Sequence, residues 1–154
     1  MVRLPLQASA DLQQEIRKIS RPARITKSSL LFTQGDRATG AFLVERGSVS
    51  LTLKANPGRS VWRRTVGKGS LLGLPATINE AEYTLTAKAV CDVDLAFIPR
   101  DNLIDAMHRN VSLAIEILKV LSQEVHDMRE LIGNRGLTAC SRRKVPLPSG
   151  RAIS

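Results

Sequence analysis

The sequence predicts a mainly β domain with helices at both ends, a sandwich or barrel built of short strands. Between residues 20 and 98, short β-prone runs alternate with turn residues, a spacing typical of such folds. The clearest run alternates Val49, Leu51 and Leu53 with polar neighbours, which gives a strand one buried and one wetter face. After Pro99 the apolar residues follow a helical period instead. At 154 residues, the chain is long enough for one such domain with its own core.

A first helix is predicted over residues 10–19. Ser9 is a suitable N-cap, and Leu12, Ile16 and Ile19 form one apolar face. Pro22 ends this helix, because proline removes a backbone donor and its ring clashes with the preceding turn. Strands are then expected over residues 23–26, 29–33, 40–46, 48–54, 60–66, 83–90 and 93–98.

Two helices follow, a short one over residues 100–108 and a long one over 111–132 that ends at Gly133 and Asn134. The long helix carries an apolar stripe with the 4-3-4-3-4 spacing of a coiled-coil seam: Ala114, Leu118, Leu121, Val125, Met128 and Ile132. A second stripe of Leu113, Ile117 and Val120 serves only the first half, so we expect it to pack on the chain's own strands. The first stripe then predicts a parallel homodimer, and the alternative is that it also packs on its own domain.

Residues 134–154 are predicted to form a basic, disordered tail, because they hold five bases, no acid and almost no periodicity. No run approaches the ~18 apolar residues of a membrane span, and residues 1–20 have no continuous apolar stretch, so a secretory signal is not expected. The two cysteines, Cys91 and Cys140, make no disulfide framework, and Cys91 is expected to be a small core residue. A cytoplasmic protein without membrane attachment is expected.

The charge is uneven along the chain. Residues 1–79 hold 13 bases and 4 acids, whereas residues 80–134 hold 5 bases and 10 acids. Segments 16–35 and 46–79 contain no acid at all. One interpretation is an ordinary solvated basic surface. The other is a nucleic-acid-associated protein that binds through the bases between residues 17 and 27 and through Arg142, Arg143 and Lys144.

Three motif blocks occur in order: residues 31–36 (Leu-Phe-Thr-Gln-Gly-Asp), residues 42–51 (Phe-Leu-Val-Glu-Arg-Gly-Ser-Val-Ser-Leu) and residues 69–73 (Gly-Ser-Leu-Leu-Gly). They resemble the cyclic nucleotide-binding sensory domain of the Crp/Fnr regulators over about residues 10–133. The resemblance implies a jelly roll, or double-stranded β-helix, followed by a long dimerisation helix. It also implies a ligand-sensing role in transcriptional or signalling regulation.

The phosphate-binding cassette of this family falls on Gly73, Leu74, Pro75, Ala76, Tyr83, Thr84 and Leu85. In members that bind cyclic AMP, a Glu of this cassette accepts from the ribose hydroxyl and an Arg neutralises the cyclic phosphate. Here Leu74 stands at the Glu position and Tyr83 at the Arg position. The purine-contacting hydroxyl of the long helix falls near Met128. Cyclic nucleotide binding as in the family is therefore not expected, and a rearranged nucleotide site remains an alternative.

Two states of this degenerate pocket are open: Tyr83 fills it and completes the core, or a small, weakly polar ligand of unknown identity binds there. We expect no cofactor, because no ligand-binding signature is intact. We expect no metal site, because His108 and His126 are eighteen residues apart. No nucleophile–base pattern or Walker-type loop occurs, so the chain is interpreted as a non-enzyme.

Crp/Fnr regulators continue past the long helix into a helix-turn-helix domain. Here about twenty residues follow Gly133, with neither the length nor the pattern of that motif. Sequence-specific DNA binding through such a motif is therefore not supported. Three histories remain open: a stand-alone module acting on a protein partner, a truncated or frameshifted regulator, or nucleic-acid binding by the basic tail.

Overall fold

The computed structural model describes residues 8–55 and 59–135. Within them the chain forms eight strands in two four-stranded sheets, together with four helices. Sheet 1 has the order β1-β8-β3-β6, formed by Arg21–Ile25, Val93–Pro99, Gly40–Arg46 and Leu71–Leu72. Sheet 2 has the order β2-β7-β4-β5, formed by Leu30–Phe32, Thr86–Ala89, Val49–Ala55 and Arg59–Val66. Successive strands alternate between the sheets except for β4 and β5, which form a hairpin within sheet 2, and every pair is antiparallel, so the predicted jelly roll is confirmed.

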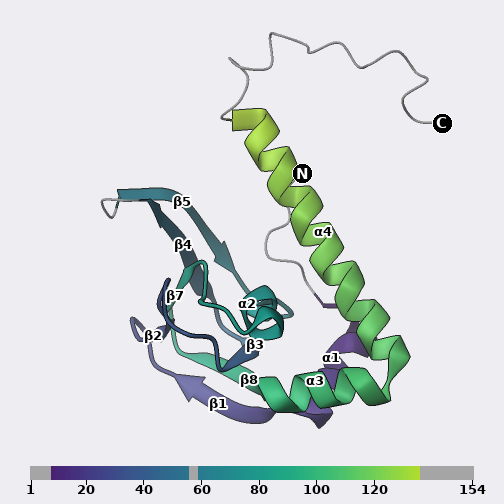
Figure 1. Cartoon of the computed structure of the whole chain (residues 1–154). Helices are drawn as coiled ribbons and strands as arrows, with labels where there is room; N and C mark the ends of the chain where they lie inside the picture. Colours follow the sequence, from purple (N-terminus) through teal and green to yellow (C-terminus); the bar gives the residue numbers. More distant parts are fainter. Residues whose placement is uncertain (1–7, 56–58, 136–154) are drawn as a thin grey trace, which may run out of the picture.

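The helices cover one side of the roll (Figure 1). Helix α1 (Ala10–Lys18) begins at the predicted cap, where the Ser9 hydroxyl accepts from the Leu12 N–H at 3.2 Å. Helix α3 (Arg100–Arg109) follows β8 directly and leads into α4 (Val111–Arg135). In the same view α4 packs at its beginning near α1 and α3, and its later part extends away from them toward the top of the picture. No helix of the described residues is long and apolar enough to cross a membrane.

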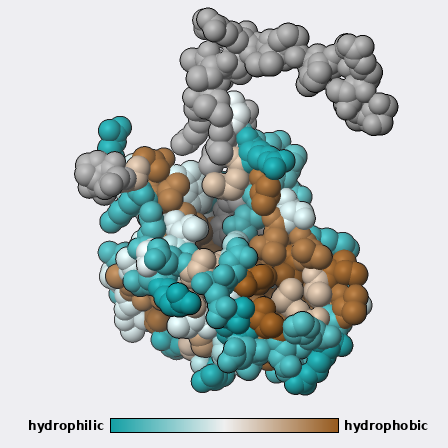
Figure 2. Space-filling model, in the orientation of Figure 1, coloured by the Kyte–Doolittle hydropathy of each residue, from teal (hydrophilic) through white to brown (hydrophobic). Residues whose placement is uncertain are grey.

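Two clusters of buried residues hold the fold together. One fills the space between the two sheets, with Val44, Val49 and Leu51 at its centre. The other lies between sheet 1 and the helices and includes Leu12, Ile16, Leu43, Ile98, Leu103, Leu113, Ile117 and Val120. The stripe of Leu113, Ile117 and Val120 therefore packs on the chain's own domain as predicted. Figure 2 shows apolar residues gathered over the helices on this side of the molecule.

Several boundaries differ from the predicted ones. The segment predicted as a strand from residue 83 becomes regular only at Thr86. Residues 71–79 form the two-residue strand β6 and the helix α2 (Leu74–Asn79), neither of which was predicted from periodicity. The long helix passes through Gly133 and continues to Arg135 rather than ending at Ile132. Cys91 is exposed, so the prediction of a small core residue is wrong. The predicted tail beyond residue 135, with Arg142, Arg143, Lys144 and Cys140, lies outside the described residues.

Candidate ligand pocket

The seven predicted pocket residues lie at the two ends of one connection. Gly73, Leu74, Pro75 and Ala76 form the start of α2, and Tyr83, Thr84 and Leu85 precede β7. Six of them line a cavity of ≈ 40 Å³ beneath α4. Leu74 does not line the cavity, because its side chain is 2% exposed and packs in the cluster on the helix side of sheet 1. The residue at the position of the family's Glu therefore points away from the cavity.

Tyr83 occupies much of the space between the cassette and the inner strands. Its side chain is 5% exposed, and its ring stacks on Phe32 with centroids 4.0 Å apart and planes 16° apart. The phenol hydroxyl donates to the Gly40 carbonyl at 2.6 Å. The Thr39 N–H in turn donates to that hydroxyl at 3.4 Å. The ring has an apolar partner and the hydroxyl has polar ones, so Tyr83 is a satisfied core residue at this position.

Helix α2 is held in place by α3. The Arg100 guanidinium donates from Nε to the Thr77 carbonyl at 2.9 Å and lies 3.7 Å from a Glu80 carboxylate oxygen. The fully buried Thr77 hydroxyl donates to the Gly73 carbonyl at 2.7 Å. Both contacts satisfy backbone carbonyls of a helix only six residues long. The cassette is therefore fixed to the helix that leads into α4.

Glu124 of α4 lines the cavity together with the cassette, although the family resemblance did not place it there. Burial, and then the nearby charge of Asp127, raise the pKa of the Glu124 carboxyl. Asp127 itself is 1% exposed and accepts from the Gln123 amide at 2.9 Å. Positions 113, 117, 120, 124 and 127 follow one helical face, and this spacing could have identified both acids. Met128, expected near the purine position, is 39% exposed and does not line the cavity.

The predicted dimer stripe follows a different face of α4. Leu118 is 57% and Val125 50% exposed, and Met128 is also exposed. Ala114 and Leu121 are half-buried, and Leu121 packs against the helix-side core. The side chain of Ile132 lies outside the described residues. Val111 and Ile115, which were not assigned to the stripe, add further exposed apolar area to this helix.

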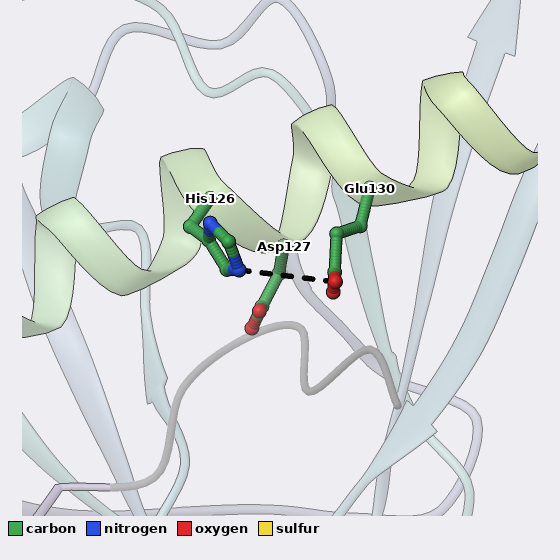
Figure 3. A group of neighbouring side chains, drawn as sticks. All are labelled: His126, Asp127 and Glu130. Atoms are coloured by element: carbon green, nitrogen blue, oxygen red, sulfur yellow. Dashed lines mark ion pairs between the residues drawn. The ribbon is translucent and has the colours of Figure 1, made fainter.

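Three side chains of metal-binding type gather on α4 (Figure 3). Ligand atoms of His126, Asp127 and Glu130 lie within 4.8 Å of one another. The expectation of no metal site rests only on the distance between His108 and His126. It leaves out Asp127 and Glu130, which follow His126 by one and four residues. His126 Nε2 lies 3.8 Å from a Glu130 oxygen, and Asp127 accepts from Gln123. Each side chain thus has a protein partner, and the absence of a metal site stays a prediction.

The predicted basic segment between residues 17 and 27 is partly neutralised. Arg17 forms a two-pronged ion pair with Glu45, with both N···O distances at 2.8 Å. The Arg24 guanidinium lies 3.9 Å from Asp92 and 3.6 Å from Asp94. These pairs reduce the positive potential that the sequence alone predicts for this segment.

Comparisons with known proteins agree with this geometry. Residues 22–110 match the family described as the cyclic nucleotide-binding domain. The anaerobic regulatory protein of Bacillus subtilis is 25% identical over 125 residues, which cover 80% of this chain and 52% of that protein. The chain therefore spans about half the length of this relative.

Solved structures share the fold. The catabolite activator protein of Thermus thermophilus superposes with a TM-score of 0.73 at 20% identity, over 81% of this chain and 59% of that one. The sensor domain of the transcriptional regulator DNR from Pseudomonas aeruginosa gives a TM-score of 0.62 at 20% identity, over 79% of this chain and 82% of that one. From its sequence match over residues 22–110 and its jelly roll, the chain belongs to the cyclic nucleotide-binding domain family.

Proposed function

We propose that the chain is a non-enzymatic, dimeric sensory or regulatory domain of the Crp/Fnr type, acting in the cytoplasm, whose family pocket holds no cyclic nucleotide. The observation that carries the proposal is Tyr83, which occupies the position of the family's phosphate-binding Arg. A phenol in this place offers no positive charge, and its hydroxyl already donates to Gly40.

The cavity supports this proposal by its size. Sites for small molecules usually measure about 300–1,000 Å³, whereas the cavity beside Tyr83 measures ≈ 40 Å³. Among the described residues, no buried side-chain nitrogen or oxygen lacks a hydrogen-bond partner. An empty site for a polar ligand usually contains buried polar atoms whose hydrogen-bond partner is the ligand. Of the two states left open by the sequence, the filled pocket is the better supported.

The charges around the cavity support it as well. No Lys or Arg is among the described lining residues, and Glu124 contributes a carboxylate. A cyclic phosphate buried here would lack a countercharge and would face an acid, which costs several kcal/mol. The lining residues also offer no nucleophile–base pair, which fits a regulatory rather than an enzymatic role.

Titration calorimetry with cyclic AMP and cyclic GMP tests the pocket. The expected result is no saturable heat at millimolar nucleotide, and no rise of Tm in the same mixtures, since a ligand that binds only the folded state raises Tm. A Tyr83→Ala variant is the matched control, because it enlarges the cavity without adding a positive charge and should also fail to bind. Saturable one-to-one binding by the unmodified chain would contradict the proposal.

The dimer is proposed from the exposed stripe of α4. Leu118, Val125 and Met128 are exposed apolar residues on one helix, and burying such a face against a second copy removes it from water. Light scattering should therefore give a mass of twice 16.8 kDa at tens of micromolar.

A Leu118→Asp substitution should halve that mass, because it places a charge within the apolar contact between the helices. Since Leu118 is 57% exposed in one chain, the fold should survive. Ser112→Asp adds the same charge to an exposed position off the stripe and should leave the mass unchanged. A monomeric unmodified chain, or a dimer that Leu118→Asp does not affect, would argue against this interface.

A further inference from the structure

The outer face of sheet 2 carries a set of bases that belongs neither to the pocket nor to the α4 stripe. Cross-strand partners share a face of a sheet, so the strand register shows which side chains lie together. Ser50 pairs with Thr65 on one side and with Lys88 on the other, and Thr52 pairs likewise with Arg63 and Thr86. Lys54 pairs with Ser60 one step further along. Because the alternate residues Val49 and Leu51 are buried in the core, Ser50 and Lys54 lie on the outer side of the strand, whereas Thr52 is itself covered, at 9% exposed.

This surface, which we call the basic face, consists of Lys54, Arg63 and Lys88 with the hydroxyl residues Ser50, Ser60, Thr65 and Thr86 between them. The three bases are exposed, and none of β2, β4, β5 and β7 contains an Asp or Glu. No acid occurs anywhere in residues 46–79. The face therefore carries cationic side chains and hydroxyl groups, and its strands contribute no carboxylate.

The bases of the basic face differ from several other bases of the described chain, which are paired with carboxylates. Arg17, Arg24, Arg100, Arg109 and Lys119 each lie within 4.0 Å of a carboxylate oxygen. No ion pair of Lys54, Arg63 or Lys88 occurs among the described residues. Positive charges that remain without counterions from the protein are free to neutralise an external anion.

The strand that carries Lys54 is braced from the neighbouring turn. The Gln34 side chain donates to the Lys54 carbonyl at 2.9 Å and accepts from the Lys54 N–H at 2.9 Å. The Gln34 N–H also donates to the Thr86 hydroxyl at 2.9 Å. This bracing keeps the strands of the basic face in fixed register, so its bases are held on a rigid sheet rather than on a loose loop.

We propose that the basic face binds the phosphate backbone of double-stranded nucleic acid without reading its sequence. Arg, Lys, Ser and Thr side chains are the groups that commonly contact backbone phosphates. The face exposes no aromatic ring, and Trp62 pairs with the inward Leu53, so the stacking that single strands require is missing. The residues between the bases are hydroxyls, and the exposed apolar side chains of this sheet, Leu30 beside Lys88 and Val61 on β5, are two rather than the continuous apolar face that inserts into a membrane. Charge and composition together thus favour a duplex.

Fluorescence anisotropy with a labelled random duplex, measured across salt concentrations with the full chain, tests the proposal. Each phosphate that the protein neutralises makes the slope of log K, the association constant, against log salt concentration more negative by about 0.9. Replacing Lys54, Arg63 and Lys88 together by Gln should therefore make the slope less negative by about 2 to 3. At constant low salt, the same variant should lose at least tenfold in affinity.

The matched control replaces Arg21, Lys27 and Arg46 by Gln. These bases are exposed, lie off the basic face and carry no ion pair among the described residues, so the loss of net charge is identical. A slope change of less than about 1 in the control supports a localised site. Equal effects in both variants, an unaltered slope in the first, or no duplex binding by the unmodified chain at low salt would overturn the proposal.

A second arm uses vesicles of neutral lipid with and without an anionic phospholipid. Leu30 and Val61, both exposed and close to the basic face, make this comparison necessary. Duplex binding without vesicle binding supports the proposal. Tighter binding to the anionic vesicles than to the duplex, abolished by the same three substitutions, would assign the face to a membrane surface instead and overturn it.

Discussion

The hydroxyl of Tyr83 donates a 2.6 Å hydrogen bond to the backbone carbonyl of Gly40, which joins the end of the cassette connection to the first residue of β3. Tyr83→Phe keeps the ring against Phe32 but leaves this buried carbonyl without the phenol. The free energy of unfolding should fall by about 1–2 kcal/mol, the usual cost of a lost buried hydrogen bond. Urea unfolding measures it, with exposed Thr84→Ala as a control that should change stability by less than about 0.5 kcal/mol. Equal stability of Tyr83→Phe and the unmodified chain would contradict the structural role of the hydroxyl.

The backbone of Gly73 lies in the left-handed region at a φ of 75°, and a Cβ there would stand 2.8 Å from Cε1 of Tyr83. Gly73→Ala therefore combines backbone strain with a clash against a buried ring. Gly35 has a φ of 95° but open space around its Cβ position, so Gly35→Ala measures the strain alone. We expect Gly35→Ala to lower the free energy of unfolding by about 1–2 kcal/mol. Gly73→Ala should lower it by about 1–3 kcal/mol more. A double variant Gly73→Ala/Tyr83→Ala should recover part of the difference between the two glycines.

Glu124 makes the stability of the chain dependent on pH. Its pKa in the folded state is raised above the ordinary value of a glutamate, by burial first and by Asp127 second. The folded state therefore binds more protons than the unfolded state between these two pKa values. The free energy of unfolding falls as the pH rises through this window, and the penalty is fully present above the folded pKa.

Glu124→Gln removes the charge and should stabilise the chain at pH 7, with no gain below the unfolded pKa. Chemical unfolding at several pH values measures the difference between the variant and the unmodified chain. Glu116→Gln is the control on the same helix, because that carboxylate pairs with Lys119. A Glu124→Gln variant that is less stable than the unmodified chain at pH 7 would show that the carboxylate has a stabilising partner.

The parts of the fold that the sequence predicts well are those in which local chemistry and burial agree. Ser9 caps α1 because its hydroxyl reaches the Leu12 N–H, and no distant contact is needed. Strand β4 alternates over Val49, Ser50 and Leu51 because one side faces the core between the sheets, although Thr52 is buried as well. Such elements repeat a single rule over several residues, so their pattern is visible without the tertiary structure.

Helix α2 and the Tyr83 segment depend on contacts that no local pattern contains. Helix α2 has six residues, too few for a period, and Arg100 satisfies one of its carbonyls from α3. The β-prone residues after position 82 predict a strand, but the Tyr83 N–H donates to the Asp36 carbonyl and the Tyr83 carbonyl accepts from Gly35. These bonds to a turn replace the sheet pairing, so the strand starts later. Tertiary contacts override local propensity at both places.

The family resemblance names the cassette residues of the candidate site but not Glu124 of α4, which lines the same cavity. Six of the seven cassette residues named from the family resemblance line one cavity, and Leu74 does not; their role in binding a ligand stays a prediction. The helix residue above the cavity was placed by counting along an ungapped resemblance, which gave Met128. Ile117, Val120, Glu124 and Asp127 lie on one face of α4. This face determines which side chains of α4 point toward the strands, and the position given by the ungapped alignment does not.

The ion pair between Arg17 and Glu45 joins α1 to β3 across the edge of the helix-side core. The hydrogen bond from Arg17 lowers the pKa of the Glu45 carboxyl, against the opposing effect of burial. The stability that this pair contributes is therefore present above the unfolded pKa and is lost as the pH falls through the lower folded pKa. Its sign is opposite to that of Glu124.

Glu45→Gln should accordingly destabilise the chain at neutral pH, and the difference from the unmodified chain should shrink in acid. Urea unfolding at pH 7 and at about pH 3 measures both values. Glu15→Gln is the matched control, because the ion pair of Glu15 within the described residues is with Lys18 of the same helix. Arg17 is half-exposed, so the effect at pH 7 should also weaken in high salt. A destabilisation by Glu45→Gln that persists unchanged at pH 3 would show that packing of the side chain, rather than its charge, links the helix to the sheet.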